Sequence, residues 1–258
     1  MDFDFGETPE SNAFFERQPG FYPVFERLVR LCNVCFGPRQ PTSLPNDIFL
    51  RLGVTCRTEF LEVLFLAANG HAVGATKLLR GLYERAVTLA YLLRHPEKVK
   101  RFVAYAAINE FRLIEAARKI MTDEQLDAVL RYGSISDMTE RYDHYKTQFT
   151  RRNKKIAPSW DVDFASQVRD VGSPFEEYYL NAYLMPTQHL HATLTSVMQP
   201  GERQSDLALA DMTLMMAHAL LLKVMELHNQ QFLLSIENEL AVCTADFVSL
   251  WKLGSPPS

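Results

Sequence analysis

The chain has 258 residues, of which 47% are hydrophobic and 22% are charged. This is an ordinary globular composition, which excludes extensive disorder and fibrous repeats. Lys and Arg total 27 against 31 Asp and Glu, and the net charge of -4 excludes a global attraction to nucleic acid or to anionic lipid. We therefore expect any such contact to be a local patch.

Two features indicate a cytoplasmic protein. The cysteines are too few and too scattered for a disulfide framework, and the N-terminus, MDFDFGETPES, is acidic where a signal peptide would be basic and then apolar. The most apolar run, Leu207 to Leu222, contains Asp211 and His218 and is too short and too polar to span a bilayer. We interpret this run as a core helix and expect no membrane association.

The pattern of apolar residues predicts an all-α protein. Residues 1–19 show no clear period, and we expect an N-terminal arm that is either mobile or docked on a partner. From Phe21 onward, apolar residues recur at helical spacing and no block alternates as a strand would. The predicted helices cover residues 21–36, 45–68, 71–94, 97–120, 123–132, 136–151, 163–170, 174–198 and 204–250, the last as two helices.

We expect one helical-bundle domain over residues 20–250, with a polar excursion near 133–171 and a tail at 251–258. Asn69-Gly70 supplies a turn, and His95-Pro96 ends one helix and begins the next. Thr122 to Gln125 and Ser173 to Glu176 both have the sequence of a capping box. No linker or solenoid-length repeat divides the chain.

Several common sites are excluded by spacing. No phosphate-binding loop follows a predicted strand, and no histidine has Glu three residues before it, as di-iron bundles require. Cys32 and Cys35 form a C-x-x-C without a second pair, which favours ordinary core cysteines. His189 and His191 are two residues apart, so on a helix they cannot face one ion. We expect neither a metal nor a cofactor.

Polar residues stand among apolar ones on two predicted helices. On the helix 71–94, Arg80 and Glu84 lie four residues apart in a second apolar stripe, opposite the main one, so we expect a central helix with these charges inside. Removing one partner of a buried pair typically costs about 3–5 kcal/mol. Thr187 and His191 interrupt the apolar stripe of helix 174–198, just after a proline at 186 that predicts a kink.

These residues carry a family resemblance. The run from Ala75 to Glu84 resembles an uncharacterised bacterial family of helical domains of unknown function, which pairs an Arg-x-x-x-Glu helix with a late Tyr-rich helix ending in Ser-x-x-x-His. Here Thr187 stands where Ser is usual, before His191. The resemblance covers roughly residues 60–230 and implies a compact helical bundle without an established activity. It extends distantly to the HEPN group of nucleotide-binding and RNA-cleaving domains, although no histidine here has the arginine spacing of HEPN ribonucleases.

Three hypotheses follow, and the sequence leaves open whether the protein is an enzyme. In the first, the cluster is structural or serves binding: Arg80 and Glu84 pair, and His191 and Thr187 hold helices in register. In the second, a metal-independent ribonuclease or defence-type toxin uses His191 as general base or acid, Arg80 to stabilise charge and Glu84 to orient Arg80. In the third, the N-terminal arm or the helices mediate an interaction such as a homodimer.

Further residues are weaker candidates. Tyr183 and Tyr105, with Arg101, are expected to support the Arg80 cluster, although their alternative role is ordinary packing. A basic run would hold phosphates of RNA without sequence specificity, or would simply be a solvated face. It comprises Arg151, Arg152, Lys154 and Lys155.

Overall fold

The computed structural model describes residues 9–130, 133–190 and 203–251 and confirms the all-α prediction. Within these residues no strand is formed, and the extended pairing is a single bridge between Thr150 and Ile156. The chain divides into two compact units, one of residues 1–94 with 168–258 and the other of residues 95–167. The domain predicted over residues 20–250 therefore contains two units.

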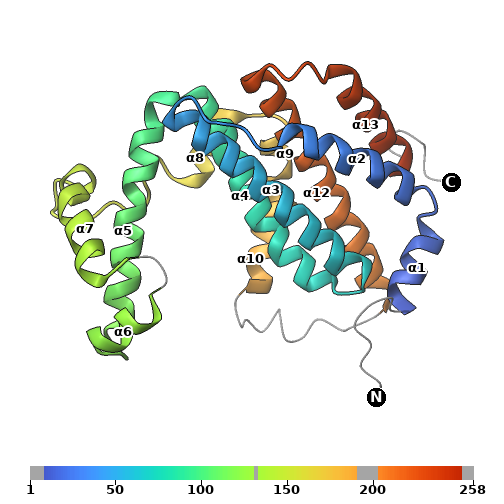
Figure 1. Ribbon diagram of the computed structural model, residues 1–258. Helices are drawn as coiled ribbons and strands as arrows, with labels where there is room; N and C mark the ends of the chain where they lie inside the picture. The colour runs from blue at the N-terminus through green and yellow to red at the C-terminus, as the bar shows by residue number, and fades with distance from the viewer. Residues whose placement is uncertain (1–8, 131–132, 191–202, 252–258) are drawn as a thin grey trace. The chain divides into compact units, whose positions relative to one another are not determined.

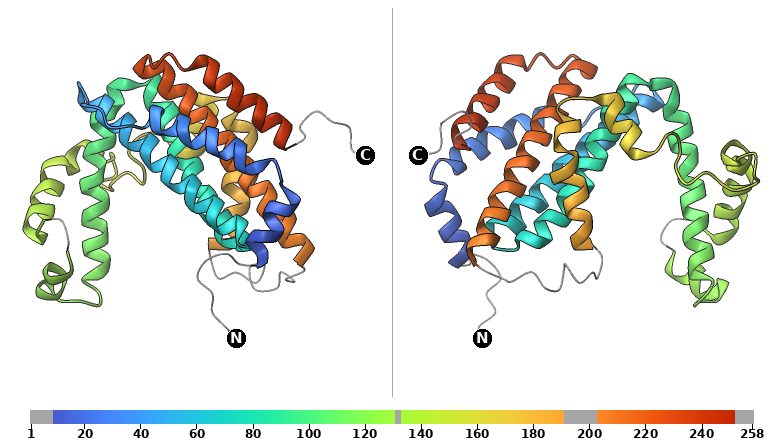
Figure 2. Two further views of the ribbon diagram at one scale, coloured as in Figure 1. Left: turned by 45° about the vertical axis from the view of Figure 1, so that its right-hand side comes forward. Right: turned by 180° about the vertical axis from the view of Figure 1, so that it is seen from behind.

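The first unit is a bundle built on three long helices, α3, α4 and α12, which lie side by side (Figures 1 and 2). Around them lie shorter helices and one π-helix, η2. The elements are α1 (Pro9–Arg17), α2 (Phe21–Cys35), α3 (Leu44–Ala68), α4 (Ala72–Arg94), α9 (Phe175–Tyr179), η2 (Leu180–Leu184), α10 (Met185–Leu190), α12 (Arg203–Phe232) and α13 (Glu237–Leu250).

The predicted central helix is confirmed as α4, which packs most extensively against α3 and α12. Its main apolar face is buried as the 3.6-residue period requires. The residues concerned are Ala75, Leu79, Leu82, Ala86 and Leu89. The residues joining the helices also behave as predicted, because Asn69 caps α3, Gly70 takes a φ of 79°, and His95 precedes a 3₁₀ turn that begins at Pro96.

Helix α12 contains the apolar run that the sequence analysis assigned to the core. By length and composition alone, residues 207–232 could cross a membrane, yet more than half of the most apolar window is buried inside the protein. Leu214, Ala217 and Leu221 are fully enclosed. Its packing against α3 and α4 gives this apolar surface the partners that a core helix requires.

The expected N-terminal arm is helical in its described part. Residues 9–17 form α1, and the ring of Phe14 is buried against Phe21 of α2 in an edge-on contact of 5.2 Å between centroids. Phe15 remains 41% exposed. The first eight residues of the arm lie outside the described residues, as do 252–258 of the tail.

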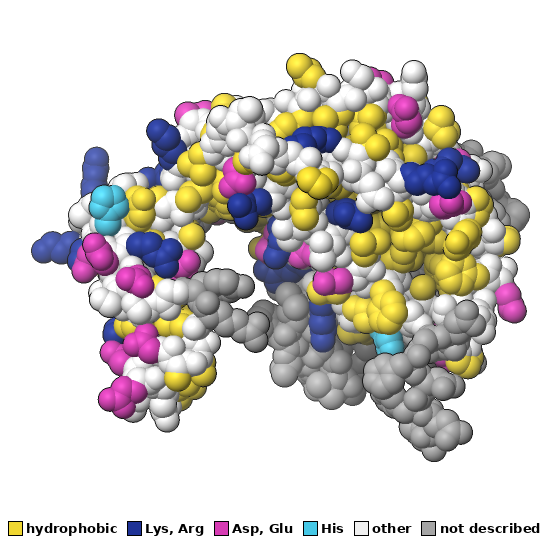
Figure 3. Space-filling model, viewed as in Figure 1, with side chains coloured by type: hydrophobic (Ala, Val, Ile, Leu, Met, Phe, Trp, Pro, Cys, Tyr) yellow, Lys and Arg dark blue, Asp and Glu magenta, His cyan; other side chains and the backbone are white. Residues whose placement is uncertain are grey.

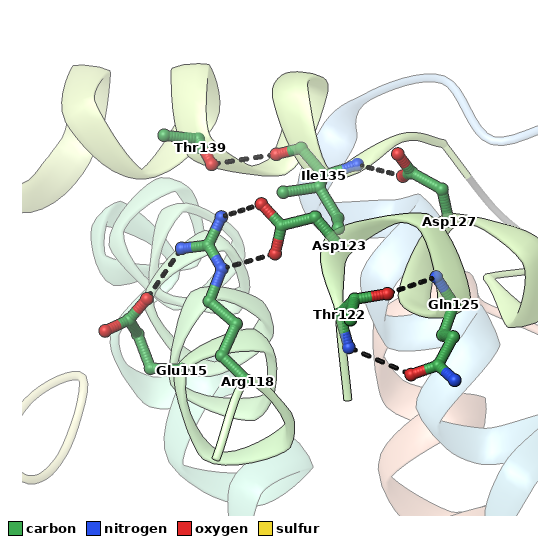
Figure 4. A network of polar contacts seen from close by, with 8 residues as sticks. All are labelled: Glu115, Arg118, Thr122, Asp123, Gln125, Asp127, Ile135 and Thr139. Atoms are coloured by element: carbon green, nitrogen blue, oxygen red, sulfur yellow. Dashed lines mark hydrogen bonds and ion pairs between the residues drawn. The ribbon is translucent and has the colours of Figure 1, made fainter. Parts of the chain in front are cut away.

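The second unit contains η1 (Pro96–Lys98), α5 (Val99–Ala117), α6 (Asp123–Val129), α7 (Ile135–Phe149) and the first half of α8 (Phe164–Val171). Figure 4 shows how its polar contacts fix the α5–α6–α7 turns: Thr122 and Gln125 form the predicted capping box, and Arg118 places two nitrogens on Asp123. Most of the predicted polar excursion, 133–171, belongs to this unit.

The second predicted capping box, at Ser173, is wrong. Pro174 takes the cap position of α9, and the Ser173 hydroxyl donates to Glu177 at 2.6 Å. A capping box is instead formed by Ser134 and Asp137 at the start of α7. Its third helical residue is Asp, whereas the usual capping-box pattern has Glu or Gln there, so the sequence pattern did not predict this box.

Candidate functional site

The charged pair of α4 is formed as expected. The Nε atom of Arg80 donates to Oε1 of Glu84 at 2.9 Å, across one helical turn. The two side chains are 22% and 40% exposed, which corrects the expectation that the charges lie inside the bundle. They belong to the face of α4 that is not fully buried, where residues 77, 80, 84 and 88 recur at helical spacing.

An aromatic side chain from a distant segment covers the guanidinium. The carbon at the centre of the Arg80 guanidinium lies 4.7 Å from the ring centroid of Tyr183, within the range of a cation–π contact. Tyr183 in turn stacks on Tyr179, with centroids 5.1 Å apart and planes 19° apart. The structure therefore brings together two residues that the sequence analysis grouped, although they are about a hundred positions apart in the chain.

The π-helix η2 positions Tyr183. Pro186 has no N–H to donate to the carbonyl of Ala182, and the chain widens into a π-turn over Leu180–Leu184 before α10 begins. The hydroxyl of Thr187 donates to the carbonyl of Tyr183 at 2.6 Å, as a back-bond from the next turn. Thr187 thus supports the cluster through Tyr183. Leu180, at the start of this π-turn, is 56% exposed.

Arg80 keeps part of its hydrogen-bonding capacity. Its Nε atom is held by Glu84 and its face by Tyr183, whereas Nη1 and Nη2 make no hydrogen bond within the described part of the chain. A guanidinium presents donors in a planar fork that matches the two oxygens of a carboxylate or phosphate. The arrangement can therefore bind an oxyanion without first reorganising the arginine.

A second ion pair, not predicted from the sequence, lies beside the first. Arg85 of α4 contacts Oε1 of Glu59 on α3 at 2.6 Å, and Glu59 is only 12% exposed. Gly81 makes room for the pair, because a Cβ atom there would lie 2.9 Å from both Arg85 Nη1 and Glu59 Oε1. A glycine in the middle of an otherwise strong helix was the available signal.

Burial raises the pKa of Glu59 to about 7. The loss of hydration is the main cause, and the charges of Glu62 and Glu84 raise the pKa further, while Arg85 opposes the shift. The second carboxylate oxygen of Glu59 is buried and has no hydrogen-bond partner. The carboxyl group of Glu59 on α3, which contacts Arg85 of α4, therefore changes charge near neutral pH, close to the Arg80 cluster.

The other predicted site residues lie elsewhere or outside the described chain. Tyr105 and Arg101 belong to a separate cluster in the second unit, where Tyr105 donates to the carbonyl of Ala157 and Arg101 to that of Trp160. His191, predicted as general base or acid, is outside the described residues. The basic run 151–155 is exposed throughout.

Two buried histidines are further titratable groups of the core. Burial lowers the pKa of both His218 and His228 to about 4. His218 accepts from the indole of Trp251 at 3.4 Å, and His228 contacts the carbonyl of Phe49 at 3.0 Å. Both rings are packed among aromatic side chains, which indicates a role in the fold.

The cysteines are buried and reduced, as expected of core residues, and burial raises the pKa of the Cys32 and Cys35 thiols to about 12. A thiol with such a pKa is a poor nucleophile at neutral pH. Among the residues that the structure describes, no three or more His, Cys, Asp or Glu side chains are grouped so that they could hold a metal ion.

Fold and site together define an all-α protein with a pre-oriented arginine on its central helix. A model of the family of unknown function DUF5677 matches residues 46–206, which contain most of α3, all of α4 and the Tyr183 segment. The chain belongs to this family. No curated protein and no solved structure matches it.

Proposed function

We propose that this protein is a binding protein whose ligand carries an oxyanion, a carboxylate or a phosphate, and that Arg80 is the recognition residue. One observation carries the proposal: the Arg80 guanidinium is fixed on two sides and keeps its Nη1 and Nη2 donors without a partner in the described chain. A donor edge held in place in this way binds with a smaller loss of conformational entropy than a free side chain.

The surrounding residues support a ligand with a flat part as well as a charge. Tyr179 and Tyr183 form a stacked, half-buried aromatic pair against which a planar group could pack. The pair is held by a π-turn, a departure from regular helix that is frequent at functional sites. Glu84 orients Arg80 but would repel an anion placed against its own carboxylate, so the ligand is expected at the opposite edge of the guanidinium.

Titration with inorganic phosphate, followed by calorimetry, tests the proposal. Arg80→Ala removes the fork and should weaken binding about tenfold or more, since a hydrogen bond to a charged group is worth about 1.5–3 kcal/mol. Arg80→Lys keeps the charge and loses the fork, and should recover only part of the affinity.

Arg51→Ala is the matched control, because Arg51 also pairs through Nε with a carboxylate one turn away, Asp47, on the exposed face of α3. It should bind phosphate like the wild type. Equal loss in the Arg51 and Arg80 variants would refute the proposal, as would an unchanged affinity in Arg80→Ala.

The second candidate function is a ribonuclease, which requires an additional catalytic residue. It requires His191 to act with Arg80, and its favourable observation is that Arg80 presents free donors to a phosphate. It predicts cleavage of RNA without added metal, abolished by His191→Ala in a protein that remains folded. Phosphate binding without cleavage would support a binding protein and exclude the nuclease.

A further inference from the structure

The second unit carries a compact group of positive charges that the Arg80 site does not use. Residues 150–156 form a tight reversal, which we call the basic hairpin. Its bridge joins Thr150 and Ile156, and the amide of Arg151 donates to the carbonyl of Lys155 at 2.8 Å. Four cations are displayed on it, all of them exposed: Arg151, Arg152, Lys154 and Lys155.

The charges of the basic hairpin are uncompensated. None of its four cations forms an ion pair or hydrogen bond through its side chain with the described part of the protein. The carboxylates that follow in sequence are engaged elsewhere, since Asp161 pairs with Lys98 at 2.7 Å and Asp163 accepts from Ser166. A net negative protein therefore presents a local site of about four unpaired positive charges.

The hairpin is anchored, so its charges are held in one place. Tyr105 and Arg112 of α5 both donate to the carbonyl of Ala157 at 2.8 Å, directly after the hairpin. Arg101 donates to the carbonyls of Gln148 and Trp160 on either side of it, at 3.1 and 2.6 Å. These contacts, made by residues from Arg101 to Arg112, fix the base of the hairpin along α5, and α6 follows the C-terminal end of that helix. Acidic side chains gather around α6 (Figure 3).

Lys154 takes a backbone conformation that lysine disfavours. Its φ is 62°, in the left-handed region where a residue with a Cβ costs about 1–2 kcal/mol more than glycine. Glycine would adopt this turn conformation without strain, so lysine at this position lowers the stability of the folded protein.

We propose that the basic hairpin binds the sugar-phosphate backbone of a nucleic acid strand. Two of its cations are arginines, whose forks match phosphate oxygens, and four closely spaced cations fit the regular charges of a polyanion. The apolar side chain of the hairpin, Ile156, packs against the core cluster of Tyr105 and Phe149 and is not available to insert into a bilayer, which favours nucleic acid over a membrane. The surface lies in the unit that does not contain Arg80, so the proposal stands independently of the Arg80 site.

The test measures binding of a fluorescent oligouridine to the full-length protein by anisotropy over a range of salt concentrations. Each phosphate contact contributes about -0.7 to the slope of log K against log salt for a single strand. The double variant Arg152→Gln/Lys155→Gln should therefore reduce the slope by about 1.4 and weaken binding roughly 25-fold near 0.1 M salt. Arg51→Gln/Lys119→Gln removes the same charge from two exposed positions outside the hairpin and should bind almost like the wild type.

The variant Lys154→Gly distinguishes a loss of binding from a loss of stability. It removes one charge and relieves the left-handed strain, so the protein should be as stable as the wild type or more stable, while binding weakens about fivefold. Equal weakening in the hairpin and control pairs would overturn the proposal, and so would failure of the wild type to bind oligouridine at low salt. The same measurement with oligothymidine shows whether the affinity differs between a ribose and a deoxyribose backbone. Stronger hairpin-dependent binding to phosphatidylserine vesicles than to oligouridine would also overturn it.

Discussion

Gly53 on α3 lies directly against the imidazole of His228, and this contact predicts an unusual effect of alanine. A Cβ atom at Gly53 would lie 2.2 Å from His228 Nε2 and 2.8 Å from Phe36 Cε1, far inside normal contact distance. His228 itself is fully enclosed and contacts the carbonyl of Phe49. We predict that Gly53→Ala displaces the ring and destabilises the protein.

The magnitude follows from three opposing effects. Alanine in a helix interior is normally favoured over glycine by about 1 kcal/mol. Against this, overpacking a close-packed core costs typically about 1–3 kcal/mol. Displacing His228 from the Phe49 carbonyl leaves a buried ring nitrogen without a partner, at a cost of about 1–3 kcal/mol. The net expectation is a loss of about 3 kcal/mol in the free energy of unfolding.

Urea denaturation followed by circular dichroism measures this difference. Gly74→Ala is the control on α4, because its added Cβ would lie 3.4 Å from the nearest atom, at the tip of Leu66. That variant should be unchanged or more stable by up to about 1 kcal/mol. Gly53→Ala with wild-type stability would refute the reasoning. Equal cost of the change in wild-type and His228→Ala backgrounds would show that the ring is not the cause.

Three further predictions concern pH, a buried hydroxyl pair and the second unit. His218 and His228 have pKa values of about 4 in the folded state, below their ordinary value of 6.5, so the stability they contribute is complete above pH 6.5 and is lost as pH falls towards 4. The loss is on the order of 3 kcal/mol per histidine, seen in thermal denaturation across that range. Thr76→Val should cost about 1–3 kcal/mol in urea denaturation by orphaning the buried Thr213 hydroxyl, 2.9 Å away, and Val at both positions should recover part of it. Arg112→Ala should speed hydrogen exchange of the Ala157 amide about tenfold, as the anchor of the basic hairpin loosens.

For each of these three predictions, one experimental outcome would contradict it. A melting temperature that stays constant from neutral pH to pH 5 would mean that the histidines are not buried in their neutral form. Additive losses in the Thr76 and Thr213 variants would mean that the two hydroxyls do not interact. Unchanged exchange at Ala157 would mean that Arg112 does not anchor the loop.

Much of the fold could be predicted because the apolar period is strong. The bounds of α2, α3 and α4 differ from the predicted ranges by one residue at most, and turns such as Asn69-Gly70 have a local physical cause. The π-turn before Pro186 could be predicted only as a kink, because the sequence shows that a hydrogen bond is lost but not how the chain compensates. Helix α1 has only nine residues, too few for a period to stand out.

The candidate site was predictable only in part. The four-residue spacing was enough to predict the ion pair between Arg80 and Glu84. The burial of these two side chains depends on which other helices cover that face of α4, and the local sequence pattern does not reveal that. The sequence predicted that Tyr183 supports the Arg80 cluster. It could not predict the contact between the Tyr183 ring and the Arg80 guanidinium, because this contact depends on the π-turn. Glu59 pairs with Arg85 across two helices, and sequence alone does not reveal the register between them.

Resonances of the Arg80 side chain give the most direct test of the Arg80 site. In a nitrogen–proton correlation spectrum of the guanidinium groups, phosphate should shift and slow the exchange of the Arg80 Nη protons, while the Nε proton, already bonded to Glu84, changes little. Arg51 should show no comparable response. Nη signals of Arg80 that remain unchanged at saturating phosphate would contradict the assignment of this arginine as the recognition residue.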